Sequence, residues 1–484
     1  MPMKFIFVLF SLFLAPLVQA QFVLSPTVES AQKSVMELRL NNASKLLAEE
    51  KRANPKNGFI PYLKCNILFS KLFITGDEVL FDAKIDSLNY FLTLVENNKA
   101  NNSPYYNYCL AEMNFEIGAL HMQFGNRWKS AWVIKDAFDY IKKNQAVADT
   151  FLPQQMLNGT LNVIMGSLPN RYKAIISLLG YSGEIEPGLR QLKKATQTEG
   201  TSYHSFKQKF TFAYCYALSS VRDESEINLW DVDPMFRESP ILVFLQATFY
   251  RSRGQNDALI ALLKKRESKA SFPLYYLDFM LGKAKLNRLD PDADANFLIF
   301  LQNYKGQNSI KAAHRYLSWH YFIRGSVNQS NSHRQKTIAL GTDVSGADKQ
   351  AIIDVNKKYN MALIKSQLFF DGGYYTIALA ELTKNAESFT SEKERIEFQY
   401  RLGRIYQRMK QESLAIQAYK KVFTFPQSSN TYEAANAALQ LALIYESLAN
   451  KKEAKFYFNK VLSYAGFPFE DGIHQKAKAG IARC

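Results

Sequence analysis

Apolar residues recur every three or four positions along most of this chain, whereas sustained alternation of apolar and polar residues is scarce. The first pattern is typical of amphipathic helices and the second of strands. One helix is expected to begin at Ser391, because Ser391 and Glu394 have the spacing of a capping box, which satisfies free backbone N–H groups at a helix start. Its apolar face comprises Phe398, Leu402, Ile405 and Tyr406. The chain is therefore predicted to be all-α.

A series of apolar, small and aromatic residues repeats in the C-terminal third of the chain. It consists of Leu402, Gly403, Tyr406, Ala415 and Tyr419, and at an offset of 39 residues of Leu441, Ala442, Tyr445, Ala454 and Phe458. An earlier unit keeps Gly373, Tyr375 and Ala378 but has Lys365 where Leu is expected. Small residues let paired helices approach closely, and aromatic residues fill the space between successive pairs. The series therefore predicts stacked helix–turn–helix units.

The same series resembles the tetratricopeptide repeat, in which a Leu-Gly pair is followed by Tyr, a small Ala, an aromatic residue and a closing Pro. The Pro falls here at Pro426, one position early. The resemblance implies an α-solenoid of tetratricopeptide-like helix–turn–helix repeats. Weaker frames with the same spacing occur upstream at Leu245, Phe249, Ala258 and Leu262, and at Ala43, Leu47 and Pro55. A bundle of unrelated amphipathic helices is the alternative fold.

A second, narrower resemblance covers residues 168–301. Here Leu168-Pro169 and Leu178-Leu179 precede Gly180-Tyr181-Ser182-Gly183, and Gly188-Leu189 follow. This order is similar to the glycine-marked helix turn of the tetratricopeptide repeat protein 39 and inclusion-body clearance family. That family usually has Asp and Arg where this chain has Glu184 and Ile185. Its members are intracellular helical-repeat proteins tied to lipid and inclusion-body handling, and only the helical-repeat fold is carried over here.

Residues 325–349 interrupt the helical pattern with a polar, glycine-containing stretch. Stretches of this composition usually form surface loops or linkers. We therefore expect a loop at 325–349 that separates a divergent helical-repeat array at 21–324 from a C-terminal tetratricopeptide repeat module at 350–484.

The first twenty residues have the features of a signal peptide. Lys4 provides a positive charge, an apolar run follows from Phe5 to Leu17, and Val18 and Ala20 place small residues before a cleavage site. Cleavage is expected after Ala20, with export to the periplasm or out of the cell. No Cys follows the cleavage site, which argues against a bacterial lipoprotein; a retained anchor helix is the alternative.

The net charge and its distribution along the chain indicate which kinds of partner to expect. The chain carries 60 Lys and Arg against 44 Asp and Glu, a net charge of +16, but the basic residues are dispersed, so no nucleic-acid partner is expected. Peripheral association with the envelope stays open. No transmembrane segment is expected after removal of the signal peptide.

The apolar surroundings of Cys65, Cys109 and Cys215 favour buried free thiols, although a Cys65–Cys109 bridge is also compatible with export.

Signatures of catalysis and of metal or cofactor binding are missing from the sequence. The six His residues form no HExxH motif, and His314 and His320 are six positions apart, off one helical face. A calcium loop starting at Asp290 would have Ala295 and Leu301 where Gly and Glu are required. We therefore expect a non-enzyme with no catalytic residue, no cofactor and no metal.

One set of residues is a candidate binding site. In tetratricopeptide repeats the first helix of each pair lines a concave groove, which implies a groove-facing set of Tyr400, Arg401, Arg404 and Arg408. The three arginines are spaced three and four apart and so project from one stripe of the helix. Guanidinium groups bind carboxylates in a bidentate manner, and Tyr400 offers a ring for stacking. An acidic or C-terminal peptide is the expected guest; a merely solvated basic face is the alternative.

The leading hypothesis is therefore an exported, non-enzymatic scaffold or adaptor that presents a preformed helical-repeat groove to another protein. The alternative is an envelope protein of the same architecture that captures a ligand or a glycan. The 14% aromatic content favours this alternative weakly, and the missing lipid-anchor Cys counts against it.

Overall fold

The computed structural model describes residues 22–98, 103–147, 150–167, 183–197, 204, 206–221, 239–266, 272–425 and 432–484. All regular secondary structure in these ranges is helical, which confirms the predicted all-α fold. The expected signal peptide, the glycine motif at 180–182 and Pro426 lie outside the described residues. No helix in the described ranges is long and apolar enough to cross a bilayer.

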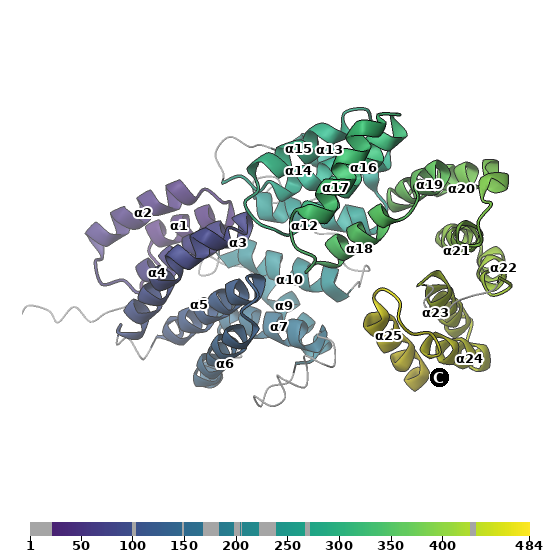
Figure 1. Cartoon of the computed structure of the whole chain (residues 1–484). Coiled ribbons are helices and arrows are strands. Elements are labelled where there is room, and N and C mark those ends of the chain that lie inside the picture. The colour runs from purple at the N-terminus through teal and green to yellow at the C-terminus, as the bar shows by residue number, and fades with distance from the viewer. Residues whose placement is uncertain are drawn as a thin grey trace, which may run out of the picture.

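The helices follow one another as packed pairs joined by turns (Figure 1). In the N-terminal part they are α1 (Pro26–Met36), α2 (Leu40–Ala53), α3 (Phe59–Thr75), α4 (Glu78–Glu96), α5 (Pro104–Gln123), α6 (Arg127–Lys143), α7 (Leu152–Ser167), α9 (Ile185–Thr196) and α10 (Lys207–Val221). The middle of the chain contains α12 (Pro240–Ser252), α13 (Asn256–Lys264), α14 (Tyr276–Asn287), α15 (Ala293–Asn303), α16 (Ile310–Ile323), α17 (Val327–Ala339) and α18 (Gly346–Asn356). The C-terminal part contains α19 (Met361–Asp371), α20 (Tyr375–Lys384), α21 (Glu392–Arg408), α22 (Glu412–Val422), α23 (Tyr432–Ser447), α24 (Lys451–Leu462) and α25 (Glu470–Arg483).

Helix α10 departs from simple pairing, because it packs against α7 and α9 and also reaches α1. Phe206 and Phe210, at its start, join a buried aromatic cluster with Tyr105 and Tyr108 of α5. Lys209 ties α10 to two further helices: its Nζ lies 2.5 Å from Glu112 Oε1 of α5 and donates to the Tyr62 hydroxyl of α3 at 3.0 Å. The core of the N-terminal part is therefore closed by a helix distant in sequence.

The buried cysteines of this part are free thiols. Cys65, Cys109 and Cys215 are all buried, and each is a free thiol. The buried free thiol expected for each of them is confirmed, and the Cys65–Cys109 bridge that the sequence left open is not formed.

In the C-terminal part, the structure explains the repeated series. Ser391 and Glu394 form the predicted capping box at the start of α21. A Cβ atom on Gly403 would lie 2.5 Å from the ring of Tyr419, so only glycine lets α22 approach this closely. Tyr419 and Ala415 are fully buried. The small and aromatic positions therefore serve helix pairing, as predicted.

The segment 325–349 differs from the loop expected there. Helix α17 occupies Val327–Ala339 and α18 begins at Gly346, so the loop prediction is wrong over 327–339 and 346–349. The buried residues of α17 are Ser330, His333 and Thr337, and the Ser330 hydroxyl donates to the Ser318 carbonyl of α16 at 2.9 Å. Helix α17 packs on α16 through polar side chains. Its buried face therefore lacks the apolar residues at three- and four-residue intervals by which a helix is recognised in a sequence. The division of the chain into two modules stays a prediction.

Two buried histidines join α16 to α17. The Nδ1 atoms of His314 and His333 lie 3.0 Å apart, so one neutral ring donates to the other. Burial lowers the pKa of His314 to about 4, with further lowering by His333 and Lys336. Burial and Lys336 also lower the pKa of His333 to about 4. Both rings are therefore neutral near pH 7.

Acid should accordingly destabilise the protein. Between about pH 6.5 and pH 4 the unfolded chain protonates these histidines while the folded chain keeps them neutral, so the free energy of unfolding falls as the pH falls. Urea unfolding at pH 7 and pH 5 measures the loss. His333→Asn removes one of the two titrating rings and should show a smaller loss. Equal losses for the variant and the unchanged protein would contradict the assignment.

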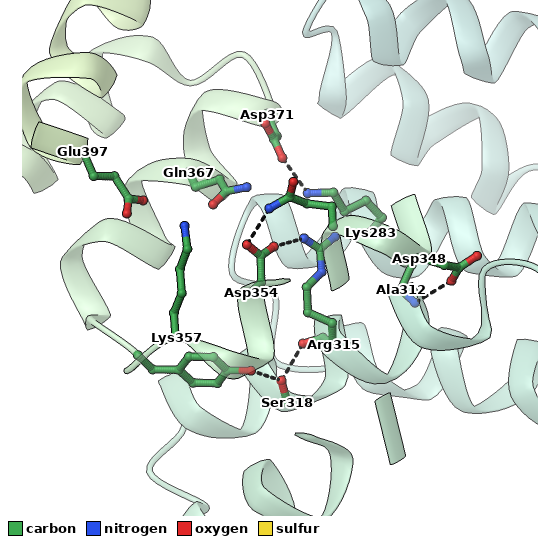
Figure 2. Close-up of polar contacts among 12 residues, drawn as sticks. Lys283, Ala312, Arg315, Ser318, Asp348, Asp354, Lys357, Gln367, Asp371 and Glu397 are labelled. Carbon is green, nitrogen blue, oxygen red and sulfur yellow. Dashed lines mark hydrogen bonds and ion pairs between the residues drawn. The ribbon is translucent and has the colours of Figure 1, made fainter. Parts of the chain in front are cut away.

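The C-terminal part meets the middle of the chain at two turns. Gly254, between α12 and α13, and Gly373, between α19 and α20, both have left-handed backbones (φ +68° and +82°), and their backbones touch. Beside them, the Tyr374 hydroxyl donates to Asp257 at 2.9 Å. Lys283 of α14 also pairs with Asp371 of α19 at 2.9 Å, as Figure 2 shows. Backbone contact and polar pairing thus hold α19 against the preceding repeats.

A candidate peptide-binding face

The first helices of the C-terminal pairs share one side of the molecule. In Figure 1, α21, α23 and α25 follow an arc on its inner side, with α22 and α24 outside. Helix α21 packs against both α19 and α23. We call the polar residues at the junction of these three helices the inner face; it comprises Lys357, Gln367, Glu397, Tyr400, Arg401, Arg404, Glu433 and Asn436.

Arg401 is engaged within the protein. Its Nη2 lies 2.5 Å from Glu397 Oε1, one turn earlier on α21, and donates to Gln367 Oε1 of α19 at 2.8 Å. Burial alone would raise the pKa of Glu397, but the charges of Arg401 and Lys357 hold that pKa below its ordinary value. A peptide carboxylate would have to compete with this internal pair for Arg401.

Arg404 has a different environment. Its guanidinium lies 5.0 Å from the centre of the Phe370 ring, and Nη1 donates to the Tyr400 hydroxyl at 3.0 Å. No Asp or Glu in the described part of the chain lies within 4.0 Å of it. Arg404 is partly exposed. It is thus a positioned cation on the inner face without an acidic partner among the described residues.

Tyr400 does not offer a free ring. It is 7% exposed, and its ring packs near those of Tyr419 and Tyr432. Its hydroxyl accepts from Arg404 and from Asn436 of α23, the latter at 2.7 Å. The Tyr400 hydroxyl thus bonds to Arg404, and the ring is too buried to offer the stacking surface expected from the sequence.

Arg408 lies one helical turn beyond Arg404 and is exposed. No ion pair involves it in the described ranges. Of the predicted set, Arg404 and Arg408 are therefore the members that remain open to a guest.

The inner face also contains charges that the sequence did not single out. Lys357 lies 3.8 Å from Glu433 of α23 and points toward the same space as Gln367 and Glu397 (Figure 2). Burial raises the pKa of Glu433 even though Lys357 lowers it. The spacing of Glu397 and Arg401, four positions apart on one helix, would have indicated their pairing. Gln367 and Asn436 come from neighbouring repeats, so only the stacking of helices reveals them.

Metal and cofactor chemistry has no visible centre in the described ranges, where no three His, Cys, Asp or Glu side chains gather as a metal site would require. The expectation of no catalytic residue, no cofactor and no metal stays a prediction.

Comparison with known proteins locates the repeats. Residues 396–427 and 435–466 match the tetratricopeptide repeat family. No curated protein matches the chain. Among solved structures, the chain is similar to the crystal structure of the APC/C hetero-tetramer Cut9-Hcn1, with 12% identity over 94% of this chain and 96% of that chain. The TM-score of this match is 0.26.

Proposed function

Since the chain contains tetratricopeptide repeats, we propose that it is an exported, non-enzymatic scaffold that binds an acidic or C-terminal peptide on the inner face. Tetratricopeptide repeats present rows of ordered helices to partner proteins, so little conformational entropy is lost on docking. Export is proposed from the leader-like residues 1–20.

The observation that supports an acidic guest is the environment of the Arg404 guanidinium group. A partly buried guanidinium interacts more strongly with a carboxylate than an exposed one does, because water screens the two charges less there. The Tyr400 hydroxyl and the Phe370 ring hold this guanidinium in place, and it lacks an acidic partner in the described part of the chain. Arg408 adds a second positive charge one turn away. A peptide carboxylate supplies the missing counter-charge.

Peptide binding can be measured by fluorescence polarisation with a labelled peptide of alternating Glu and Ser that ends in a free carboxylate. Arg404→Gln should weaken binding by about tenfold or more, which corresponds to about 1.4 kcal/mol. The matched control is Arg395→Gln, because Arg395 is exposed on the same helix and its side chain bonds, among the described residues, only to the Thr390 carbonyl. This control should bind nearly as well as the unchanged protein.

Three results would contradict the proposal. They are a failure of the unchanged protein to bind the peptide, equal binding by both variants, and equal binding of a Gln and Ser peptide with an amidated end. Circular dichroism of Arg404→Gln separates lost contact from lost folding, since the helical signal should be unchanged.

Capture of a small polar ligand or a glycan is the second candidate function. A cavity of about 370 Å³ lies between α6, α7 and α9, and amides and cations line it, among them Gln154, Asn158, Arg190 and Gln191. Such groups can bind hydroxyl and carboxylate oxygens. However, none of the described lining residues is aromatic, whereas ligand pockets are usually lined largely by apolar and aromatic side chains. The peptide-binding proposal is therefore the better supported of the two.

A further inference from the structure

Two tryptophans of α6 point away from the protein core. Trp128 is 74% exposed and Trp132 is 58% exposed. They lie four positions apart and so share one face of the helix. The opposite face of α6 is buried through Ser130, Ala137 and Phe138. Tryptophan side chains are seldom this exposed on a surface that contacts only water, because burial of the large ring is energetically favourable.

Further exposed apolar side chains lie beside these tryptophans. The turn between α3 and α4 adjoins the turn between α5 and α6, because Gln123 Nε2 donates to the Phe73 carbonyl at 3.2 Å. The stacked rings of Phe81 and Phe124, 4.6 Å apart, join the same two turns. Five large exposed side chains belong to the helix ends at these two turns or to the first turns of α6, and we call them the tryptophan face: Phe73, Val79, Met122, Trp128 and Trp132.

Basic residues accompany the tryptophan face. Arg127 and Lys129 flank Trp128, and both are exposed. Helix α6 as a whole has five basic residues against two acidic ones, a net charge of +3, within a chain of net charge +16. Acidic residues are also close, since Glu78 precedes Val79 at the start of α4. Asp139 of α6 pairs with Lys135 at 2.6 Å, so the positive charges that stand beside the tryptophans are those of Arg127 and Lys129.

We infer that the tryptophan face binds the interface of an anionic lipid bilayer. Tryptophan partitions into the headgroup region, where its ring contacts acyl chains and its N–H reaches polar groups. Lys and Arg beside it attract anionic headgroups. Helix α6 lies at the periphery of the molecule in Figure 1, so a flat bilayer can reach it. This binding is peripheral and does not depend on the peptide proposal.

Sedimentation with lipid vesicles tests the inference. The chain beginning at Gln21 is used, so that the apolar run from Phe5 to Leu17 does not contribute. The protein should sediment with vesicles that mix phosphatidylglycerol and phosphatidylcholine, and more weakly with phosphatidylcholine alone. Trp128→Ser combined with Trp132→Ser should lower the partition coefficient by about tenfold or more, because both interfacial rings are lost. Arg127→Gln combined with Lys129→Gln should lower binding to the anionic vesicles only.

Phe456→Ser provides the matched control. Phe456 is also a strongly exposed aromatic residue, but it lies on α24 of the C-terminal part. Its loss should leave vesicle binding nearly unchanged. Because all these side chains are exposed, the variants should keep the circular dichroism and melting temperature of the unchanged protein.

Tryptophan fluorescence gives a second measurement. Trp319 is 2% exposed, so a blue shift on adding vesicles would come from tryptophans outside the core. The shift should disappear in the double tryptophan variant. The inference is wrong if the unchanged protein stays in the supernatant or if the double variant binds equally well. It is also wrong if ultracentrifugation shows a dimer that the double variant abolishes while no vesicles are bound, since a second copy of the chain would then be the occupant.

Discussion

Replacing Lys209 with Met should destabilise the protein by about 3–5 kcal/mol, because it leaves the buried carboxylate of Glu112 without its counter-charge. Glu112 is buried, and Lys209 is the cation that contacts it, at 2.5 Å. The second oxygen of Glu112 accepts a hydrogen bond from the Tyr62 hydroxyl at 2.5 Å. These bonds orient the carboxylate but do not neutralise it.

A second buried acid, Glu116, belongs to the same cluster but carries little charge at neutral pH. Burial, followed by the charge of Glu112, raises the pKa of Glu116 to about 8, so Glu116 is largely protonated at neutral pH. Its Oε2 accepts from Asn66 Nδ2 at 2.8 Å. Lys209 therefore balances one carboxylate, and without it the cluster would hold a negative charge with no positive neighbour in contact among the described residues.

Urea unfolding at pH 7 measures the effect, and the double variant Lys209→Met, Glu112→Gln provides the control. The side-chain amide introduced by Glu112→Gln keeps a hydrogen-bonding group for Tyr62 without a charge, so the double variant should regain a large part of the lost stability. A loss below about 1 kcal/mol for the single variant, or no recovery in the double variant, would show that the ion pair does not stabilise this core.

Replacing Gly373 with Ala should cost about 2–4 kcal/mol at the junction of α12–α13 with α19–α20. A left-handed backbone disfavours any Cβ, at roughly 1–2 kcal/mol. At Gly373 the added Cβ would also overlap the carbonyl oxygen of Gly254. Since the obstacle is backbone, no rotamer change relieves it, and the two turns must move apart.

Gly325 is a matched control for this substitution. It has a left-handed backbone as well, with φ +76°, but a Cβ there would meet no atom within 4 Å. Gly325→Ala should therefore lower the free energy of unfolding only by the cost of a Cβ on a left-handed backbone, about 1 kcal/mol. Urea unfolding of both variants separates backbone conformation from contact. Equal losses would mean that the contact between the turns contributes nothing to stability.

The candidate site illustrates how far sequence reasoning extends. Spacing placed Tyr400, Arg401, Arg404 and Arg408 on one helix, and the structure has all four on α21. The spacing of Glu397 and Arg401 also indicates that these two side chains pair within α21. Spacing does not reveal the contacts that Gln367 makes with Arg401 and Asn436 makes with Tyr400, because both amides lie on neighbouring helices. The preference for Arg404 over Arg401 thus rests on one local ion pair and on contacts between repeats.

The sequence by itself determined the helical fold, the capping box at Ser391 and the repeated close approach of Gly403 to Tyr419. These features depend on residues of one helix or one helix pair, and their spacing reflects the period of the α-helix directly. Only the tertiary structure decided that α10 closes the N-terminal core, that the polar residues 327–339 are helical, and that two glycine turns meet at Gly254 and Gly373. Each of these depends on side chains or backbones from distant parts of the chain, whose meeting no local period encodes.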